Sequence, residues 1–341
     1  MKTYPFLFVG PTTLELLNLI NNYSSHKKKN IAYVATRNQI ESEYFGTGYV
    51  NKLTTKKFSK IINSYNNPNL YLARDHCGPL INTKYDLKTE INNCIRVIDD
   101  DILNGFDYLH LDVSKLNNIS KKIEVLQQIY DLSKIKNSKI KLEVGIDSHE
   151  KTSNFKEIKL LIKEFKVSHL AYVTISNGTY ITENFQSGIY KTKIINKITN
   201  FLHEENILIK DHNSDYLEFN EIYRRLAGGV NSMNIQPQNA YIENSLILFL
   251  ANKIGLTNEI NNCYKLLLKN KNLKKWTTSK NKEKLFKLGL HYLQNYEVYK
   301  RIINKIKNKT NYTYLLKMLV YNNLDRYFLA YDSFYSMRRK R

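Results

Sequence analysis

Apolar and polar positions alternate between two patterns along most of the chain. Short runs rich in β-branched and aromatic residues, typical of buried strands, are followed by segments whose apolar residues recur at helical spacing, as at Leu14, Leu17 and Ile20. The strand-like runs begin near Pro5, Asn30, Asn69, Asp107, Lys139, Ser168, Asn206 and Ser232. The pattern therefore predicts eight strands that alternate with helices.

Eight strands and their helices over about 250 residues match the size of one closed parallel barrel with right-handed crossovers. We predict a (β/α)8 barrel, the TIM barrel of the α/β class, over residues 1–255. The same alternation also allows an open doubly wound sheet. The GxGxxG turn that would favour the open sheet does not follow the first strand, where the sequence reads VGPTTLE.

The chain after Gly255 has no further strand pattern. Helical spacing returns in Ile260–Leu268, Leu285–Ile302 and Leu315–Tyr335, and aromatic residues are frequent there. Aromatic residues at helical spacing most often pack on a scaffold. We predict that residues 256–341 form a helical C-terminal extension. It folds against the barrel or against another subunit, so a homo-oligomer is expected.

Composition and charge narrow the class of protein. The 341 residues carry a net charge of +21, but the lysines are spread over nearly every predicted helix, so a nucleic-acid partner is not expected. No run of about 20 apolar residues predicts a membrane span. The apolar part of the N-terminus is too short for a secretory signal. We expect a cytoplasmic protein without a membrane partner.

Acids and histidines stand where three of the predicted strands end. Asp75 and His76 end the third strand, Glu143 the fifth, and Asp211 and His212 the seventh. The carboxyl ends of all barrel strands open onto one face, so these side chains are expected to converge. An acid inside a barrel is costly unless it is paired or binds a ligand. We therefore predict a metal site with His76, His212 and Glu143 as ligands.

This set of ligands suggests a particular chemistry. Two imidazoles and a carboxylate suit Zn²⁺, and they also admit Mn²⁺ or Co²⁺. Such a cation stabilises the negative charge on a ketone oxygen when the neighbouring C–C bond is broken or remade. A separate carboxylate must then move a hydroxyl proton. Asp75 is the first candidate, because on an extended segment it should point away from its neighbour His76, and Asp112 is the second.

Two other residues have structural interpretations. Asp215 is expected to cap the helix that begins at YLEF, because an acid at a helix start satisfies free N–H groups. His110 lies within the fourth strand, where a position in the core or at the bottom of the barrel is the default. Neither residue is assigned to the site.

Six motifs, in order along the chain, carry a resemblance to a known family. They are AYVATRNQIESEYFGTGY (Ala32–Tyr49), LARDHCGP, GFDYLHLDVS (Gly105–Ser114), LEVG, KDHNSDY and YNNLDRYFLAY (Tyr321–Tyr331). They resemble E-A-T-x-N-Q-V with its glycine-rich turn, G-G-D-H-L-G-P, G-F-x-x-I-H-L-D-x-S, T-E-V-P, x-H-S-T-D-Y and S-x-S-D-R-I-R-Y-Y-W. These are motifs of the Z-type, non-catalytic subunits of class II tagatose-bisphosphate aldolase, whose relatives include sugar and sugar-phosphate 4-epimerases.

The resemblance implies roles for individual residues. The family's Asp-His pair falls on Asp75 and His76, its glutamate on Glu143, its strand-seven histidine on His212 and its strand-four aspartate on Asp112. Its polar pair after strand two falls on Asn38 and Gln39. The chain departs from the family at Ser176, Asn177 and Gly178, where the family has Gln-Pro-Gly, and at Asp211, where it has Gly or Ala. Asn38, Gln39, Ser176 and Asn177 are the predicted substrate-binding residues.

Two functions remain open at this point. The first is a metal-dependent enzyme of sugar metabolism that acts on a ketose or ketose phosphate by C4 epimerisation or aldol-type C–C cleavage. The alternative is a non-catalytic subunit that stabilises a separate tagatose-bisphosphate aldolase chain, with the aromatic extension as its interface. The presence of His76, Glu143 and His212 favours the enzyme, because a supporting subunit does not need three converging ligands.

Overall fold

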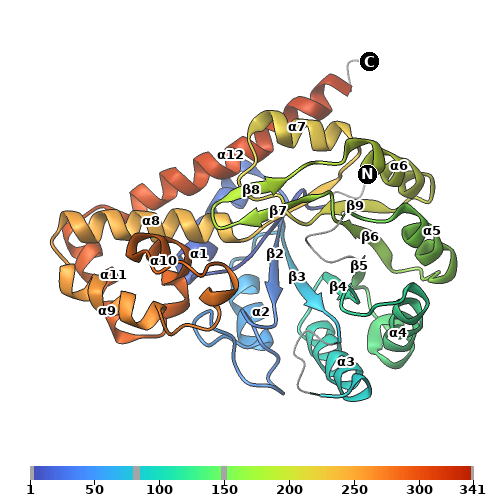
Figure 1. Cartoon of the computed structure of the whole chain (residues 1–341), viewed down its shortest axis with the longest axis horizontal. Helices are drawn as coiled ribbons and strands as arrows, with labels where there is room; N and C mark the ends of the chain where they lie inside the picture. The colour runs from blue at the N-terminus through green and yellow to red at the C-terminus, as the bar shows by residue number, and fades with distance from the viewer. Residues whose placement is uncertain (1–3, 80–84, 147–151, 339–341) are drawn as a thin grey trace.

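The runs predicted as strands form a closed barrel of eight parallel strands, which confirms the predicted fold class. The computed structural model describes residues 4–79, 85–146 and 152–338. Around the barrel the strands are β1 (Leu7–Val9), β2 (Ile31–Thr36), β3 (Leu70–Cys77), β4 (Tyr108–Asp112), β5 (Lys141–Gly145), β6 (Leu170–Ile175), β9 (Leu208–Asp211) and β10 (Ser232–Ile235). Figure 1 shows the helices packed around them.

Within the described residues, eight helices follow the barrel strands, and four more make up the extension. The barrel helices are α1 (Leu14–Lys27), α2 (Thr55–Ser64), α3 (Leu87–Leu103), α4 (Ile119–Leu132), α5 (Phe155–Glu164), α6 (Thr192–Glu204), α7 (Phe219–Ala227) and α8 (Pro237–Lys253). The extension has α9 (Thr257–Leu267), α10 (Lys282–Gly289), α11 (Glu297–Lys309) and α12 (Tyr312–Arg338). Short 3-10 turns lie at Lys134–Asn137, Leu273–Lys275 and Leu290–Leu293.

A hairpin that the strand pattern does not predict follows β6. Its antiparallel strands are β7 (Thr179–Thr182) and β8 (Phe185–Gly188). Glu183 at its tip accepts a hydrogen bond from the Thr277 hydroxyl (3.1 Å) and pairs with Lys284 of α10 (2.5 Å). The hairpin therefore joins the barrel to the extension.

The inside of the barrel is layered. Its lower layer is apolar and is built around Phe8, Tyr108 and Tyr172, whose ring centroids lie 5.4–5.9 Å apart. Successive side chains of a strand point to opposite faces, so the residues two positions further along face inward again. On β4, β5, β6 and β9 these are His110, Glu143, Thr174 and Lys210. A polar layer therefore lies directly above the aromatic one, toward the carboxyl ends of the strands.

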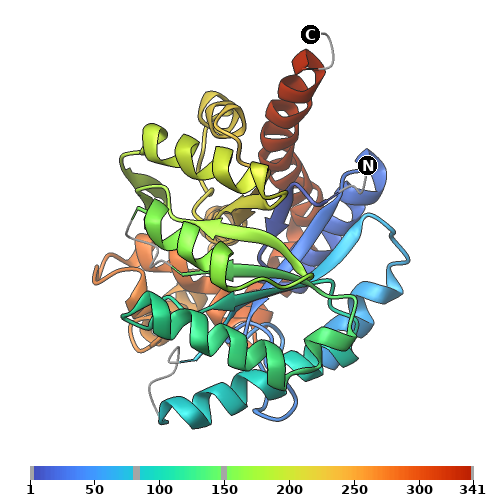
Figure 2. The same cartoon turned by 90° about the vertical axis from the view of Figure 1, so that its right-hand side faces the viewer.

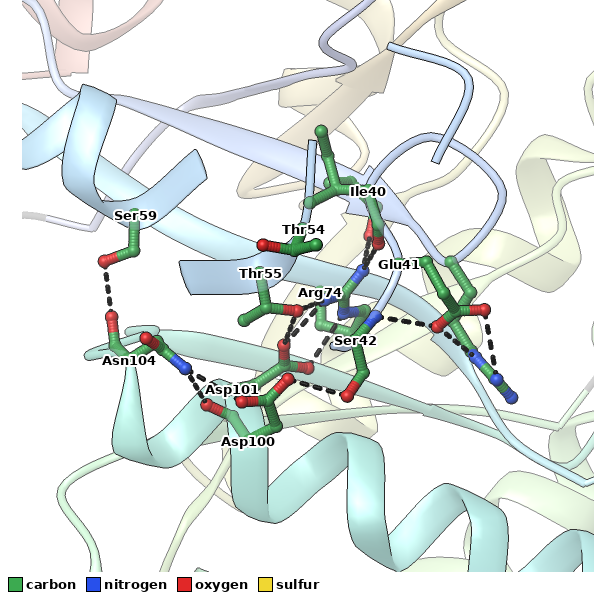
Figure 3. Close-up of polar contacts among 12 residues, drawn as sticks. Ile40, Glu41, Ser42, Thr54, Thr55, Ser59, Arg74, Asp100, Asp101 and Asn104 are labelled. Carbon is green, nitrogen blue, oxygen red and sulfur yellow. Dashed lines mark hydrogen bonds and ion pairs between the residues drawn. The ribbon is translucent and has the colours of Figure 1, made fainter. Parts of the chain in front are cut away.

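A buried arginine fixes the outer face of β3 (Figure 3). The Arg74 guanidinium donates two hydrogen bonds to the Asp101 carboxylate on α3, at 2.6 and 2.8 Å. It also donates to the Thr55 hydroxyl (2.9 Å) and to the Ile40 carbonyl (2.6 Å). Both charged side chains are fully buried. The pair joins β3 to α2, to α3 and to the loop after β2.

The extension packs on the barrel along one side, at the left in Figure 1. Its long helix α12 crosses α7, α8 and α1, and its last turns extend past the barrel (Figure 2). Tyr23 on α1 donates a hydrogen bond to Asp325 (2.8 Å), and the rings of Phe6 and Phe328 lie 5.7 Å apart. Gln294 binds the Thr12 carbonyl after β1 (2.9 Å). The predicted helical extension is therefore present and shares a continuous core with the barrel.

Most aromatic side chains of the extension pack within the chain. Tyr327, Phe328 and Phe334 are buried on α12. The exposed apolar residues of this helix are Tyr314, Leu315, Met318 and Leu319 near its start, and Leu329 and Met337 further along. Among the described helices, none is long and apolar enough to cross a membrane.

The expectation for Asp215 is wrong. Its carboxylate accepts hydrogen bonds from the backbone N–H groups of Gln236 and Gln238, both at 2.9 Å, so it holds the start of α8. The helix α7 is capped by Glu218 instead, through a reciprocal pair with Glu221. The sequence pattern did not show this, because Asp215 reaches a helix that starts more than twenty residues later.

Glu243 on α8 gives a pH-dependent test of this packing. It is buried and accepts hydrogen bonds from Thr13 and Tyr312, both at 2.8 Å. Burial raises its pKa to about 7, above that of an unfolded glutamate, so the folded chain binds the extra proton and stability falls as pH rises toward 7. Glu243→Gln should remove that loss, which amounts to about 3 kcal/mol at most. Urea unfolding at pH 5 and pH 8 measures it.

The exposed Glu204→Gln on α6 is the matched control, and it should leave the pH dependence unchanged. A Glu243→Gln protein that loses as much stability between pH 5 and pH 8 as the wild type would contradict the assignment.

Candidate active site

The third strand brings two site residues to one place through a bulge. Arg74 pairs with Leu109 but Cys77 pairs with Leu111, so β3 has one extra residue here. His76 adopts a left-handed backbone, with φ of 50°. As a result, the His76 Nε2 atom lies 3.7 Å from Asp75 Oδ2. The expectation that Asp75 points away from His76 is therefore wrong, because the segment is not regularly extended.

His110, which the sequence pattern assigned to the core, lies beside Asp75 and His76. It is 2% exposed, and its Nδ1 lies 2.9 Å from Asp75 Oδ1. The ring fits because β5 has a glycine beside it: a Cβ on Gly145 would lie 2.4 Å from His110 Nε2. The sequence signal was present, because His110 is two residues before Asp112 and so shares its face of β4.

Asp112 orients His76. Its Oδ2 lies 2.5 Å from His76 Nδ1, and its Oδ1 accepts the backbone N–H of Ser114 (2.9 Å). Burial lowers the pKa of His76, but Asp75 and Asp112 outweigh it and raise that pKa to about 9. Burial raises the pKa of both acids, yet the neighbouring histidines hold the pKa of Asp75 and of Asp112 well below their usual range. Both acids are therefore carboxylates at neutral pH.

His212 completes a group of three imidazoles. It directly follows β9, and its ring centroid lies 4.7 Å from that of His76 and 5.7 Å from that of His110. The two rings of His76 and His212 are inclined by 31°. The predicted pair of histidines, which are more than 130 residues apart in the chain, is thus brought together.

Glu143 reaches the same layer, but its carboxylate has two close partners. Lys210 of β9 forms an ion pair with Oε2, and the Thr174 hydroxyl donates to Oε1. His110 Nδ1 lies 3.7 Å from Oε1. The Lys210 side chain is fully buried, with its ammonium 4.2 Å from the centre of the Phe8 ring below. Sequence reasoning missed Lys210, although its position two residues before His212 puts it on an inward face.

Asp211 does not join the group. Its carboxylate forms an ion pair with Arg225 of α7 and accepts a hydrogen bond from the Asn177 amide (2.6 Å). It lies on the face of β9 opposite to Lys210 and His212. The expected convergence therefore holds for Asp75, His76, Glu143 and His212, and it fails for Asp211.

The four residues predicted to bind substrate have different surroundings. Gln39 is buried, with its amide oxygen accepting the Thr36 N–H (2.9 Å) and its amide nitrogen donating to the Pro11 carbonyl (2.6 Å). Asn177 binds Thr179 as well as Asp211. Ser176 is buried beside Ser153, and Asn38 is exposed. Gln39 and Asn177 thus shape loops at the mouth of the barrel, and substrate contact stays a prediction for all four.

A pocket at the same end of the barrel is enclosed partly by the extension. Thr12 and Gln236 contribute from the barrel, and Trp276 and Tyr292 contribute from the extension, with the Trp276 indole donating to the Tyr292 hydroxyl (3.0 Å). The Thr12 hydroxyl is buried and has no hydrogen-bond partner within the described residues. The extension therefore forms one wall of the barrel mouth.

The residues of the polar layer fit a divalent cation. Donor atoms of Asp75, His76 and His110 lie within 4.8 Å of one another, and this group shares only His76 with the predicted ligands His76, Glu143 and His212. Asp112 is hydrogen-bonded to His76 Nδ1. This is the usual arrangement of a metal-binding histidine, whose other nitrogen, here Nε2, is the ligand. Asp75 Oδ2 is buried without a hydrogen bond from any described residue. Asp75, Asp112 and Glu143 are all buried, and the buried Lys210 ammonium pairs with Glu143.

Comparison with known proteins shows a shared fold. No protein-family model and no curated protein matches the sequence. Among solved structures, a probable tagatose 6-phosphate kinase from Sinorhizobium meliloti has a TM-score of 0.76 at 13% identity, over 96% of this chain and 100% of that one. A fructuronate-tagaturonate epimerase from Cohnella laeviribosi has 0.61 at 11% identity, over 95% and 81%. A fructose-bisphosphate aldolase from Campylobacter jejuni has 0.56 at 12% identity, over 92% and 91%.

These matches extend beyond the barrel. Most of each chain is covered, including the part of this chain that contains the extension. The barrel that the strand and helix patterns predicted is therefore found in structures described as a fructose-bisphosphate aldolase and a fructuronate-tagaturonate epimerase. At 11–13% identity this likeness concerns the fold alone.

The contact of Gly145 with His110 can be tested by a double-mutant cycle. Gly145→Ala should displace the His110 ring and destabilise the protein by about 1–3 kcal/mol, the usual cost of overpacking. In a His110→Ala background the added methyl group has space, so most of that cost should disappear. Chemical unfolding of the four proteins measures the coupling. Equal costs in both backgrounds would show that the ring and the glycine do not constrain each other.

Proposed function

We propose that this protein is a metal-dependent enzyme of sugar metabolism that acts on a ketose or ketose phosphate. The reaction is C4 epimerisation or aldol-type C–C cleavage. The observation that carries the proposal is the meeting of His76 and His212, with Asp75, at the carboxyl end of the barrel strands. This is the end at which (β/α)8 barrels hold their active sites.

Each residue has a distinct role in the proposal. His76 and His212 supply imidazole ligands, and Glu143 supplies the carboxylate ligand. Asp112 holds His76 in the tautomer that leaves Nε2 available. A divalent cation, with Zn²⁺ preferred and Mn²⁺ or Co²⁺ also suited, would polarise the substrate carbonyl. Asp75 takes up and returns the proton of the substrate hydroxyl through Oδ2, which lies beside His76 Nε2.

Asp75 is suited to proton transfer by its surroundings. Its pKa lies well below the usual range, so it is a deprotonated carboxylate at neutral pH. His110 binds Oδ1 and fixes the carboxylate, which leaves Oδ2 oriented toward the ligand His76. Epimerisation and aldol cleavage need the same proton transfer, because both begin with deprotonation of the hydroxyl at the bond that breaks. The residues described are therefore compatible with either outcome.

An interaction role is the second candidate. Tyr314, Leu315, Met318 and Leu319 form an exposed apolar group on one helix, α12, which is the type of surface that subunits use. A homo-oligomer or a complex with an aldolase chain would cover it. The two candidates differ in one respect, since a supporting subunit needs no turnover of its own.

Metal content tests the ligand assignment. The full-length protein should take up close to one Zn²⁺ or Co²⁺ per chain, and His76→Ala or His212→Ala should each remove it while circular dichroism stays unchanged. The partly buried His169, whose ring contacts Tyr130 and Ser138, provides the control, so His169→Ala should keep the ion. Elemental analysis and calorimetry measure this. A stoichiometric ion that survives both substitutions would refute the ligand assignment.

Turnover tests the role of Asp75. Asp75→Asn should keep the ion but lose about 10²–10⁴-fold in kcat, the usual contribution of a general acid–base group. The assay follows C4 inversion and aldol cleavage on hexuloses, their 6-phosphates and their 1,6-bisphosphates. Full activity in Asp75→Asn would move the proton transfer to another residue, and loss of the ion would make Asp75 a ligand. Wild-type protein that binds the ion but turns over none of the panel would favour the supporting subunit.

A further inference from the structure

Lys210 is a charged side chain with no access to solvent. Its side chain is 0% exposed, and its ammonium lies between the Glu143 carboxylate and the face of the Phe8 ring. Removing an ammonium from water is costly, so such a group persists only with a close counter-ion. Glu143 is that counter-ion, and it is also buried, with a side-chain exposure of 1%. This ion pair thus links strands β5 and β9 across the barrel interior.

The Glu143 carboxylate also has a second proposed partner, the metal. Under the proposed function Glu143 is the acidic ligand of the metal, in the layer that contains His76 and His212. Oε1 of Glu143 accepts a hydrogen bond from the Thr174 hydroxyl, and Oε2 forms an ion pair with Lys210. A carboxylate oxygen that is in contact with an ammonium is a weaker ligand, because the ammonium already neutralises its charge. Lys210 and the metal are therefore alternative cations for one group.

We infer that Lys210 is an internal competitor of the metal for Glu143, and so sets the affinity of the site. This inference rests on the proposed function. In the structure, Glu143 forms an ion pair with Lys210, and this ion pair must open before Glu143 can bind a metal. The apparent affinity for the metal equals the intrinsic affinity multiplied by the fraction of molecules in which the ion pair is open. The wild-type protein should then bind the metal less tightly than a variant without the Lys210 charge.

The competition makes a prediction about charge and distance. Lys141, on the same strand as Glu143, has its ammonium over the Tyr4 and Tyr108 rings at the lower end of the barrel and 3.3 Å from the Tyr108 hydroxyl. Removing its charge changes the net charge by the same amount as removing that of Lys210. If the effect of Lys210 comes from contact with Glu143, only the Lys210 substitution should matter.

The test is a thermodynamic cycle on the full-length protein with Co²⁺ as the probe. Wild type, Lys210→Met, Glu143→Gln and the double variant are freed of metal, and Co²⁺ affinity is measured against a chelator together with the visible spectrum. Lys210→Met should bind Co²⁺ about tenfold or more tightly, within the 10–100-fold range of outer-sphere residues. Adding Glu143→Gln to Lys210→Met should cancel the gain in Co²⁺ affinity. The same Glu143→Gln substitution should change the visible Co²⁺ spectrum far more in the Lys210→Met protein than in the wild type. Lys141→Met should leave the affinity close to that of wild type.

Lys210→Gln carries the same expectation and replaces Lys210→Met if the latter does not fold. Unchanged or weaker binding in the neutral variants, or a gain that survives Glu143→Gln, would overturn the inference. In that case, binding that is still abolished by His76→Ala would leave the proposed metal site intact. Binding that does not depend on His76 would instead refute the proposed site, and with it the competition.

Discussion

The orientation of β3 depends on the buried ion pair between Arg74 and Asp101. Successive residues of a strand face opposite sides, so fixing Arg74 on the helix side places Asp75 inside the barrel. The guanidinium also holds the loop after β2 through the Ile40 carbonyl and the start of α2 through Thr55. Breaking a buried pair of this type costs about 3–5 kcal/mol. The site is therefore supported from outside the barrel, by residues that contact no substrate.

The barrel interior adds a second constraint, which is the neutralisation of its own charges. The aromatic layer around Phe8 excludes water beneath the polar layer, so every charge above it needs a partner within the protein. Asp112 and Asp75 are compensated by histidines, and Glu143 is compensated by Lys210. One set of contacts therefore provides both the stability of the interior and the chemical character of the site.

The sequence pattern located all eight barrel strands, because buried strands and amphipathic helices differ in period. It also placed His76 and His212 at the ends of β3 and β9, whereas Glu143 lies in the middle of β5. It failed where one residue changes the local geometry: the bulge in β3 and the left-handed His76 turn two neighbours toward the same point. His110 and Lys210 were missed because polar residues in a strand interior look like exceptions to a buried pattern. Their inward face could have been found by counting two residues from Asp112 and His212.

The contacts of α12 have a consequence for how the chain is made. The helix α12 packs on the first βα unit, through Tyr23 of α1 with Asp325 and through Phe6, just before β1, with Phe328, across more than 300 residues of sequence. Gln294 likewise binds the carbonyl of Thr12. Contacts this distant in sequence form late and slow the folding of a chain. During synthesis the contacts of α12 with the first βα unit can therefore form only after α12 has left the ribosome, when all eight barrel strands have already been made.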